Sequence, residues 1–384
     1  MSAFDEIINR RNTGSLKWNV NKNELPMWVA DMDFAAAPEI REAIIKRAEH
    51  GIYGYSVITD EWYDAYVSWW KSRHGFNMEK DWLIFTDGIV PAISSIVRKL
   101  TTPAENVAVL TPVYNIFFNS ILNNGRNVLP CELVYENGEY HIDFNALETV
   151  LKDGQTTLMI LCNPHNPIGK IWDRDTLLRI GELCKKHGVT VVSDEIHCDI
   201  TAPGKGYVPF ASVSKTCRDI SVTCLAPTKA FNLAGLQTAA VAVADPVLRH
   251  KVWRGLNTDE VAEPNAFAVP AAVAAFTKGA KWLDEFRDYV FDNRRAAEDY
   301  IEKNISEITP VKGEATYLMW LDCKNADSDL LAESLRKNTG LIVSSGTQYG
   351  SSGFLRVNIA CPRTVLFDGL RRLERGMKAC GGKA

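Results

Sequence analysis

Apolar residues gather in short runs through the middle of the chain. Runs rich in β-branched residues, apolar at successive positions, are typical of strands buried on both faces of a sheet. They span residues 106–110, 157–161, 189–193, 220–224 and 239–243. Between them, apolar residues recur at helical spacing, as in Ile89–Leu100 and Arg174–His187. The alternation predicts an α/β fold with a mostly parallel central sheet flanked by helices.

The pattern changes after residue 284. A long charged helix is predicted over 285–304, and the elements after it alternate less regularly. They are a strand at 317–321, a helix at 328–338, a Gly/Ser-rich loop at 344–353, a strand at 354–359 and a last helix. We therefore predict a large domain over residues 46–284 and a smaller α+β domain over residues 285–384.

The N-terminal residues 1–45 are predicted to pack on the small domain. Residues 1–17 are polar and helix-like, whereas residues 21–34 are irregular and carry Met27, Trp28 and two aspartates. An apolar stretch without regular structure needs partners that cover it, so we expect residues 21–34 to contact both domains.

Composition narrows the classes of partner. The chain has 43 Lys and Arg residues against 47 Asp and Glu, a formal net charge of −4. No basic field attracts nucleic acid or an anionic membrane, so small molecules and other copies of the chain are the expected partners. No apolar run is long enough to span a bilayer and no apolar signal region is seen, so a cytoplasmic location is expected.

The cysteines argue against a metal site. There are nine, an odd number, and no two show C-x-x-C spacing. Neither a zinc site nor a disulfide framework is expected. Free cysteines within apolar runs, such as Cys162, Cys224 and Cys361, suit a reducing compartment.

Lys229 is the first candidate for chemistry. It follows a predicted strand, its neighbours are small or apolar, and no acidic residue lies within several positions. A lysine that loses hydration has a lowered pKa and becomes a Schiff-base nucleophile. The alternative is a surface lysine whose stem lies along apolar residues.

Two more candidates follow predicted strands. Asn166 lies in the Asn-Pro turn of residues 162–169 and could donate to a ligand oxygen, although Asn-Pro pairs also form purely structural turns. Asp194 is placed to hold a cationic ring nitrogen, or else to cap the next helix. Nearby His197 is expected to be a satisfied polar residue rather than a catalyst.

Three further positions complete the set. Gly88 precedes a predicted helix, where free backbone N–H groups can meet a phosphate. Tyr114, after the strand 106–110, could stack on a flat ring or fill the core. Arg356 lies inside an apolar strand, where it needs either a substrate carboxylate or an internal salt bridge.

The order of these parts resembles that in fold-type I pyridoxal-5′-phosphate (PLP) enzymes of the aspartate aminotransferase superfamily, over nearly the whole chain. Within it, the chain is similar to the MalY/PatB group of cystathionine β-lyases, also called C–S lyases. The resemblance is carried by residues 26–34 (PMWVADMDF), Gly54-Tyr55, 162–169 (CNPHNPIG), 193–199 (SDEIHCD) and 228–236 (TKAFNLAGL). The first motif best separates this group from ordinary transaminases.

This resemblance implies how the cofactor would be held. Lys229 would carry PLP as a Schiff base, and Asp194 would pair with the pyridinium nitrogen. Asn166 would hydrogen-bond the ring 3′-oxygen, and Tyr114 would stack on the ring.

It also implies roles around the phosphate and the substrate. The backbone amides of Gly88 and Ile89 would hold the phosphate, and Ala30 and Arg356 would bind the substrate. Tyr55 would be a catalytic residue that reaches into the neighbouring subunit's site. A homodimer with active sites at the interface is therefore implied.

Three positions depart from the superfamily pattern. Ala226 stands where a phosphate-binding serine is common, and Thr228 is expected to supply a hydroxyl instead. Gln237 stands where an arginine is frequent, and Asp87 beside the phosphate loop would repel the phosphate unless it turns away. These departures predict weaker retention of the cofactor rather than a different one.

The activity implied by the resemblance is β-elimination. Lys229 would take the α-proton, and cystathionine would yield homocysteine, pyruvate and ammonia. An amino-acid aminotransferase of the same fold is the first alternative, because the same Lys, Asp and Arg serve both reactions. A regulatory protein that acts through a protein contact is the second. The preference for a lyase rests on residues 28–34.

Overall fold

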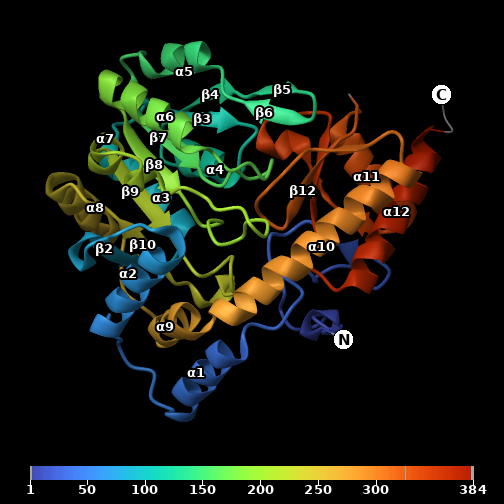
Figure 1. The fold of residues 1–384 in the computed structure, drawn as a ribbon, viewed down its shortest axis with the longest axis horizontal. Coiled ribbons are helices and arrows are strands. Elements are labelled where there is room, and N and C mark those ends of the chain that lie inside the picture. Colours follow the sequence, from blue (N-terminus) through green and yellow to red (C-terminus); the bar gives the residue numbers. More distant parts are fainter. Residues whose placement is uncertain (1, 325, 382–384) are drawn as a thin grey trace.

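A seven-stranded sheet forms the larger part of the computed structural model, which describes residues 2–324 and 326–381 (Figure 1). Its order is β2-β10-β9-β8-β7-β3-β4. These strands are β2 (Leu83–Thr86), β3 (Asn106–Thr111), β4 (Asn127–Glu132), β7 (Thr156–Cys162), β8 (Thr190–Asp194), β9 (Ser221–Leu225) and β10 (Ala239–Ala242). Strand β10 runs opposite to the other six strands of this sheet. The predicted α/β fold with a mostly parallel sheet is confirmed.

The apolar runs located the central strands but neither edge strand. The five predicted strands correspond to β3, β7, β8, β9 and β10. Strand β4 was missed because it is an edge strand with mostly exposed or half-buried side chains and contains Pro130, which an edge tolerates. Strand β2, at the other edge, has only four residues.

Helices cover both faces of this sheet. On one face α3 (Ile89–Leu100), α4 (Ile116–Leu122) and α8 (Pro246–Thr258) share a core with β3, β7 and β9. On the other face α5 (Phe144–Leu151), α6 (Arg174–His187) and α7 (Lys215–Asp219) pack against β7 and β8. Helix α2 (Asp60–His74) places Trp62, Tyr66 and Trp70 fully inside the core, next to α9 (Ala268–Lys278).

A second, antiparallel sheet lies at the other end of the molecule (Figure 1). Its order is β11 (Thr309–Pro310), β12 (Leu318–Asp322), β15 (Phe354–Asn358) and β14 (Ser344–Ser345). It is accompanied by α10 (Ala280–Asn304), α11 (Ser328–Thr339) and α12 (Arg363–Gly381). The hairpin β5 (Val134–Glu136)–β6 (Glu139–His141) lies in sequence between β4 and β7 of the large sheet. Helix α10, which is 25 residues long, extends from beside α9 to the second sheet (Figure 1).

The N-terminal segment lies against the C-terminal elements. Strand β1 (Leu25–Pro26) pairs in parallel with β13 (Leu341–Ile342), and the Phe4 ring packs on Phe286 of α10. Helix α1 (Pro38–Glu49), in contrast, packs on α9. The predicted end of the N-terminal segment, residue 45, lies inside α1. We therefore propose that the segment that packs on the small domain ends before this helix. The other domain limits stay predictions.

The expectation of a helix within residues 1–17 is wrong. Only one 3₁₀ turn forms there, at Ala3–Asp5. The polar residues are used in long-range ion pairs instead: Arg10 binds both Asp31 and Asp33 at 2.7 Å, and the buried Lys17 binds Asp33 at 2.8 Å. These pairs hold the irregular segment in place. No helix in the described part of the chain is long and apolar enough to cross a membrane.

Candidate active site

A cavity of about 240 Å³ opens at the carboxyl ends of the central strands. This is where open α/β sheets bind ligands. It brings together residues from six separate regions of the sequence. The predicted residues that line it are Ala30, Gly88, Ile89, Tyr114, Asn166, Asp194, Thr228 and Lys229.

Lys229 follows β9 and points into this cavity. Its Nζ donates to the backbone oxygen of Ala30 at 2.7 Å. Burial, and then the positive charge of Arg356, lower the pKa of Lys229 to about 8. The alternative of a solvated surface lysine is therefore wrong, and a neutral amine is accessible near physiological pH.

Asp194 is buried at the end of β8, beside the same cavity. Its Oδ1 accepts the backbone N–H of Ile196 at 3.1 Å, within a turn and not at the start of a helix, so the capping alternative is wrong. Burial raises the pKa of Asp194 to about 6. No ion pair to it exists within residues 2–324 and 326–381. A buried carboxylate without a cation fits a cationic ring nitrogen.

Arg356 is buried on β15 and contacts two backbone or amide oxygens. It donates to Asn166 Oδ1 at 3.3 Å and to the Trp28 carbonyl at 2.9 Å, and it lies over the ring of Tyr349. Its Nε has no partner. The expected alternative, an internal salt bridge, is absent from the described residues. This guanidinium fits an incoming carboxylate.

The start of α3 supplies backbone donors at another wall of the cavity. Gly88 is the N-cap residue of α3, no side chain caps the helix, and Ile89 begins it. Asp87 also lines the cavity, where partial burial and the charge of Glu263 raise its pKa. Such N–H groups fit a phosphate.

The departures from the superfamily pattern lie on the same wall. Ala226 is buried and offers no hydroxyl, whereas Thr228 and Gln237 both line the cavity. Gln237 adopts a left-handed conformation with φ of 50°. Thr228 and Gln237 are both neutral, so neither offers the phosphate a positive charge.

The motif of residues 26–34 supplies backbone carbonyls to the site. Asn358 Nδ2 donates to the carbonyls of Val29 and Asp31, at 2.6 Å each. Between them, the Ala30 carbonyl accepts from both Lys229 and the Tyr317 hydroxyl. The motif is therefore fixed by side chains of the catalytic region, which contact its main chain.

Sequence reasoning missed several residues around the cavity. Cys162 and His197 line it, and Tyr317 holds Ala30. His197 was expected to be a satisfied polar residue, but its Nδ1 is buried without a partner, so this expectation is wrong. The histidine three positions after Asp194, in the same turn, was the available signal.

Tyr55 does not line the cavity formed by its own chain. Its side chain is fully exposed and borders a separate groove of about 920 Å³, together with Val57 and Trp253. Within one chain, therefore, the structure does not bring Tyr55 together with Lys229.

Comparison with known proteins identifies the family. Residues 16–373 match the family model of aminotransferase class I and II. The chain is 43% identical to cystathionine beta-lyase PatB of Bacillus subtilis, over 97% of this chain and 99% of PatB. It is 31% identical to Protein MalY of Escherichia coli, over 99% of this chain and 100% of MalY. Cystalysin from Treponema denticola, whose structure contains a pyridoxal 5′-phosphate cofactor, matches with a TM-score of 0.95 and 32% identity, over 99% of this chain and 100% of cystalysin. The chain therefore belongs to the aminotransferase class I and II family, and within it to the MalY/PatB group that its motifs predicted.

Proposed function

We propose that this chain is a PLP-dependent carbon–sulfur β-lyase that cleaves cystathionine, or cysteine-type substrates, to a thiol, pyruvate and ammonia. The observation that carries the proposal is one cavity in which Lys229, Asp194 and Asn166 meet, in a chain 43% identical to cystathionine beta-lyase PatB. The cystalysin cofactor and the full-length match to it support PLP as the cofactor.

Several groups around the cavity have a matching group on PLP. The buried Asp194 would keep the ring nitrogen protonated, and Asn166 would donate to the ring oxygen. Tyr114 would lie against the ring, while the N–H groups of Gly88 and Ile89 would take the phosphate. When bound, PLP supplies the electron sink that makes an amino acid's α-hydrogen acidic.

Lys229 and Arg356 would act on the substrate. Arg356, with its unpartnered Nε, would bind the α-carboxylate of the amino acid. Lys229, whose lowered pKa lets it both take and give a proton, would remove the α-proton. It could then protonate the departing sulfur.

Release of pyruvate from cystathionine tests the proposal. A lyase releases pyruvate continuously in the absence of any keto acid, whereas an aminotransferase stops after one turnover, with the cofactor left in its amine form. No pyruvate under conditions of full PLP loading would contradict the lyase assignment. A purely regulatory protein would keep its effect on its partner after loss of Lys229.

Arg356→Lys should raise the KM for cystathionine with a smaller change in kcat. Lysine keeps the charge but loses the planar fork that binds a carboxylate through two bonds. Losing one hydrogen bond to a charged group costs about 1.5–3 kcal/mol, roughly a 10- to 100-fold rise in KM. Steady-state kinetics measure both constants, with the exposed Arg218→Lys as the matched control. Equal KM values for the wild type and Arg356→Lys would remove Arg356 from the substrate site.

A homodimer would explain the position of Tyr55. We propose that the exposed Tyr55 reaches the cavity of a second copy, with the neighbouring apolar side chains of Val57 and Trp253 covered at the interface. A cytoplasmic location is proposed on separate grounds: eight of the nine cysteines are free and buried thiols.

Tyr55→Phe and Lys229→Ala should therefore complement each other. If Tyr55 acts across the interface, a mixed dimer contains one intact site, made of Lys229 from one chain and Tyr55 from the other. Random mixing of two inactive variants should restore about a quarter of wild-type activity, because half of the dimers carry one working site of two. Mass spectrometry of the assembled dimers measures the fraction of mixed dimers, and pyruvate release measures the restored activity. Failure to regain activity, with mixed dimers present, would place Tyr55 outside the partner's site.

A further inference from the structure

Asn166 is held at two points and keeps one free donor. Its backbone N–H donates to Cys162 Sγ at 3.4 Å, and its Oδ1 accepts from Arg356 at 3.3 Å. The residue is 3% exposed, and its Nδ2 has no partner among residues 2–324 and 326–381 and stays open to the cavity. An open amide donor in a buried site fits an acceptor oxygen of a ligand.

The Cys162 thiol supplies the hydrogen bonds that close the turn before Asn166. Cys162 is the last residue of β7, and the prolines of the following turn have no N–H. Its Sγ accepts the Asn166 N–H and also donates to the Pro164 carbonyl, at 3.4 Å each. No backbone oxygen in the described part of the chain accepts the Asn166 N–H. The buried N–H therefore depends on the thiol for its partner.

The first residue of this turn is fixed to the strand that carries Asp194. Cys162 lies opposite Asp194 in the register of β7 and β8, and the Asn163 N–H donates to the Asp194 carbonyl at 2.9 Å. Trp172 Nε1 donates to the Cys162 carbonyl at 3.1 Å. Through its sulfur, Cys162 thus ties Asn166 to the strand end at Asp194.

Burial keeps Cys162 in its thiol form. Burial, and then the negative charge of Asp194, raise the pKa of Cys162 above its usual value. A thiol donates and accepts at the same time, whereas a thiolate only accepts. Both hydrogen bonds of the sulfur are therefore kept at physiological pH.

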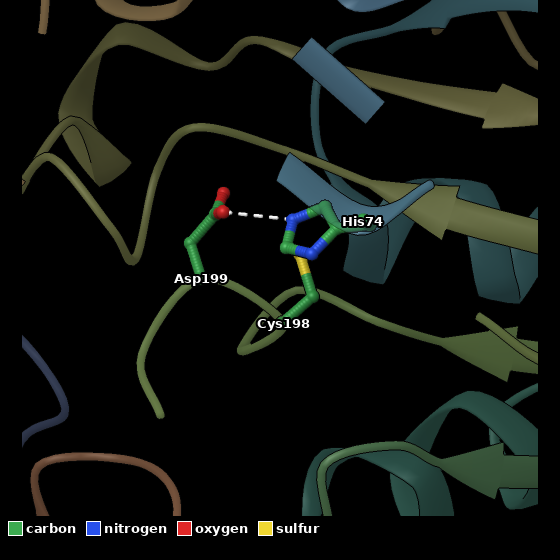
Figure 2. A group of neighbouring side chains, drawn as sticks. All are labelled: His74, Cys198 and Asp199. Carbon is green, nitrogen blue, oxygen red and sulfur yellow. Dashed lines mark hydrogen bonds and ion pairs between the residues drawn. The ribbon is translucent and has the colours of Figure 1, made fainter. Parts of the chain in front are cut away.

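Another buried thiol, Cys198, lies outside the cavity. It belongs to a group with His74 and Asp199, whose possible ligand atoms lie within 4.8 Å of one another (Figure 2). The Asp199 carboxylate is already engaged by Trp69 Nε1 at 3.0 Å and by His74 Nε2 at 2.9 Å, so this group ties α2 to the turn after β8. Among the described cysteines, Cys162 alone lines the active-site cavity.

We propose that Cys162 is a positioning residue for the cofactor. Its thiol holds the main chain of Asn166 so that the free Nδ2 meets the ring oxygen of PLP, and its effect on the cofactor passes through Asn166. The inference rests on the proposed function, because it takes PLP as the ligand.

Substitutions of Cys162 separate the hydrogen bonds from packing. Cys162→Ala removes both bonds of the thiol, and Cys162→Val repeats the test with a larger apolar side chain if alanine does not fold. Cys162→Ser keeps a group that donates and accepts. Cys184→Ala is the matched control, because it removes a fully buried thiol from the core on the other face of the sheet.

Absorbance titration of the apoprotein compares PLP with the analogue that lacks the ring hydroxyl. Cys162→Ala should weaken PLP binding about 3- to 10-fold, the effect of one typical hydrogen bond, and leave the affinity for the analogue unchanged. Cys162→Ser should lose less than Cys162→Ala, and Cys184→Ala should match the wild type for both ligands. A packing defect would instead weaken both ligands equally.

A double-mutant cycle with Asn166→Ala tests whether the effect passes through Asn166. If it does, Cys162→Ala should cost no further PLP affinity once the amide is gone. Losses that add, equal losses for PLP and the analogue, or no loss at all overturn the proposal. A wild type that binds no PLP would instead refute the proposed function.

Discussion

Lys229→Ala is expected to abolish cystathionine cleavage, with a loss of about 10⁴-fold, the upper range for removing a general acid–base group. The lysine would attach the cofactor and move the α-proton, and no other amine among the described residues lines the cavity. Pyruvate release measures the loss. Borohydride should fix PLP covalently to the wild type and not to the variant, which mass spectrometry of the peptide containing residue 229 detects.

The rate of cofactor capture should report the same amine. Only a neutral amine attacks the aldehyde of PLP, and the pKa of Lys229 is lowered to about 8. At pH 7 this gives ~300-fold more neutral amine than an ordinary lysine has. Capture by the apoprotein should therefore rise with pH and level off above about pH 8. A rate that keeps rising tenfold per unit to pH 10 would contradict the lowered pKa.

Keeping the positive charge at residue 229 is not expected to keep the function. Lys229→Arg keeps a cation beside Ala30 but cannot lose its proton at accessible pH. It should therefore fold like the wild type and be as inactive as Lys229→Ala. Activity in Lys229→Arg would show that Lys229 acts only through its charge.

Local patterns were sufficient for the parts of the site that follow strands. Lys229, Asp194 and Asn166 each come directly after an apolar run, and parallel strands end at one edge of the sheet, so their meeting follows from the order of the strands. Their chemistry follows from residue type. The meeting of these three residues required no information beyond the alternation of strand and helix.

Contacts between distant segments were beyond the reach of such patterns. The ion pairs of Arg10 with Asp31 and of Lys17 with Asp33 decide that residues 1–17 are not a helix. Local propensity carries no trace of a partner 16 or more residues away. In the turn after β8, Asp199 likewise accepts a hydrogen bond from Trp69, 130 residues away in the sequence.

The departures from the superfamily pattern should affect how the phosphate of the cofactor is bound. With Ala226 and Gln237 in place of a hydroxyl and a cation, backbone amides at the start of α3 supply a larger share of the binding. Asp87 beside them adds repulsion toward a phosphate. Asp87→Asn, which removes this charge, should therefore tighten PLP.

Asp194→Asn should have opposite effects on the empty and the loaded protein. In the folded apoprotein the pKa of Asp194 is raised to about 6, so its contribution to stability is present at low pH and is lost as pH rises through 6. A shift of about two units corresponds to about 3 kcal/mol. Asparagine never ionises and can still accept the Ile196 N–H bond. The apo variant should therefore unfold at higher denaturant than the wild type at pH 8, and at the same denaturant near pH 4.

With PLP and substrate bound, the wild type should instead perform better than Asp194→Asn. The ring nitrogen then has no carboxylate to hold its proton, and breaking a buried ion pair costs about 3–5 kcal/mol, which corresponds to a roughly 10²- to 10³-fold loss of pyruvate release. Asp87→Asn is the matched control, because it removes a carboxylate from the same cavity and should tighten PLP rather than impair turnover. Urea unfolding of the apoprotein and kinetics of the holoenzyme measure the two halves. If Asp194→Asn stabilised the apoprotein at pH 8 but left turnover intact, the buried charge would be real and its role in holding the ring nitrogen would be wrong.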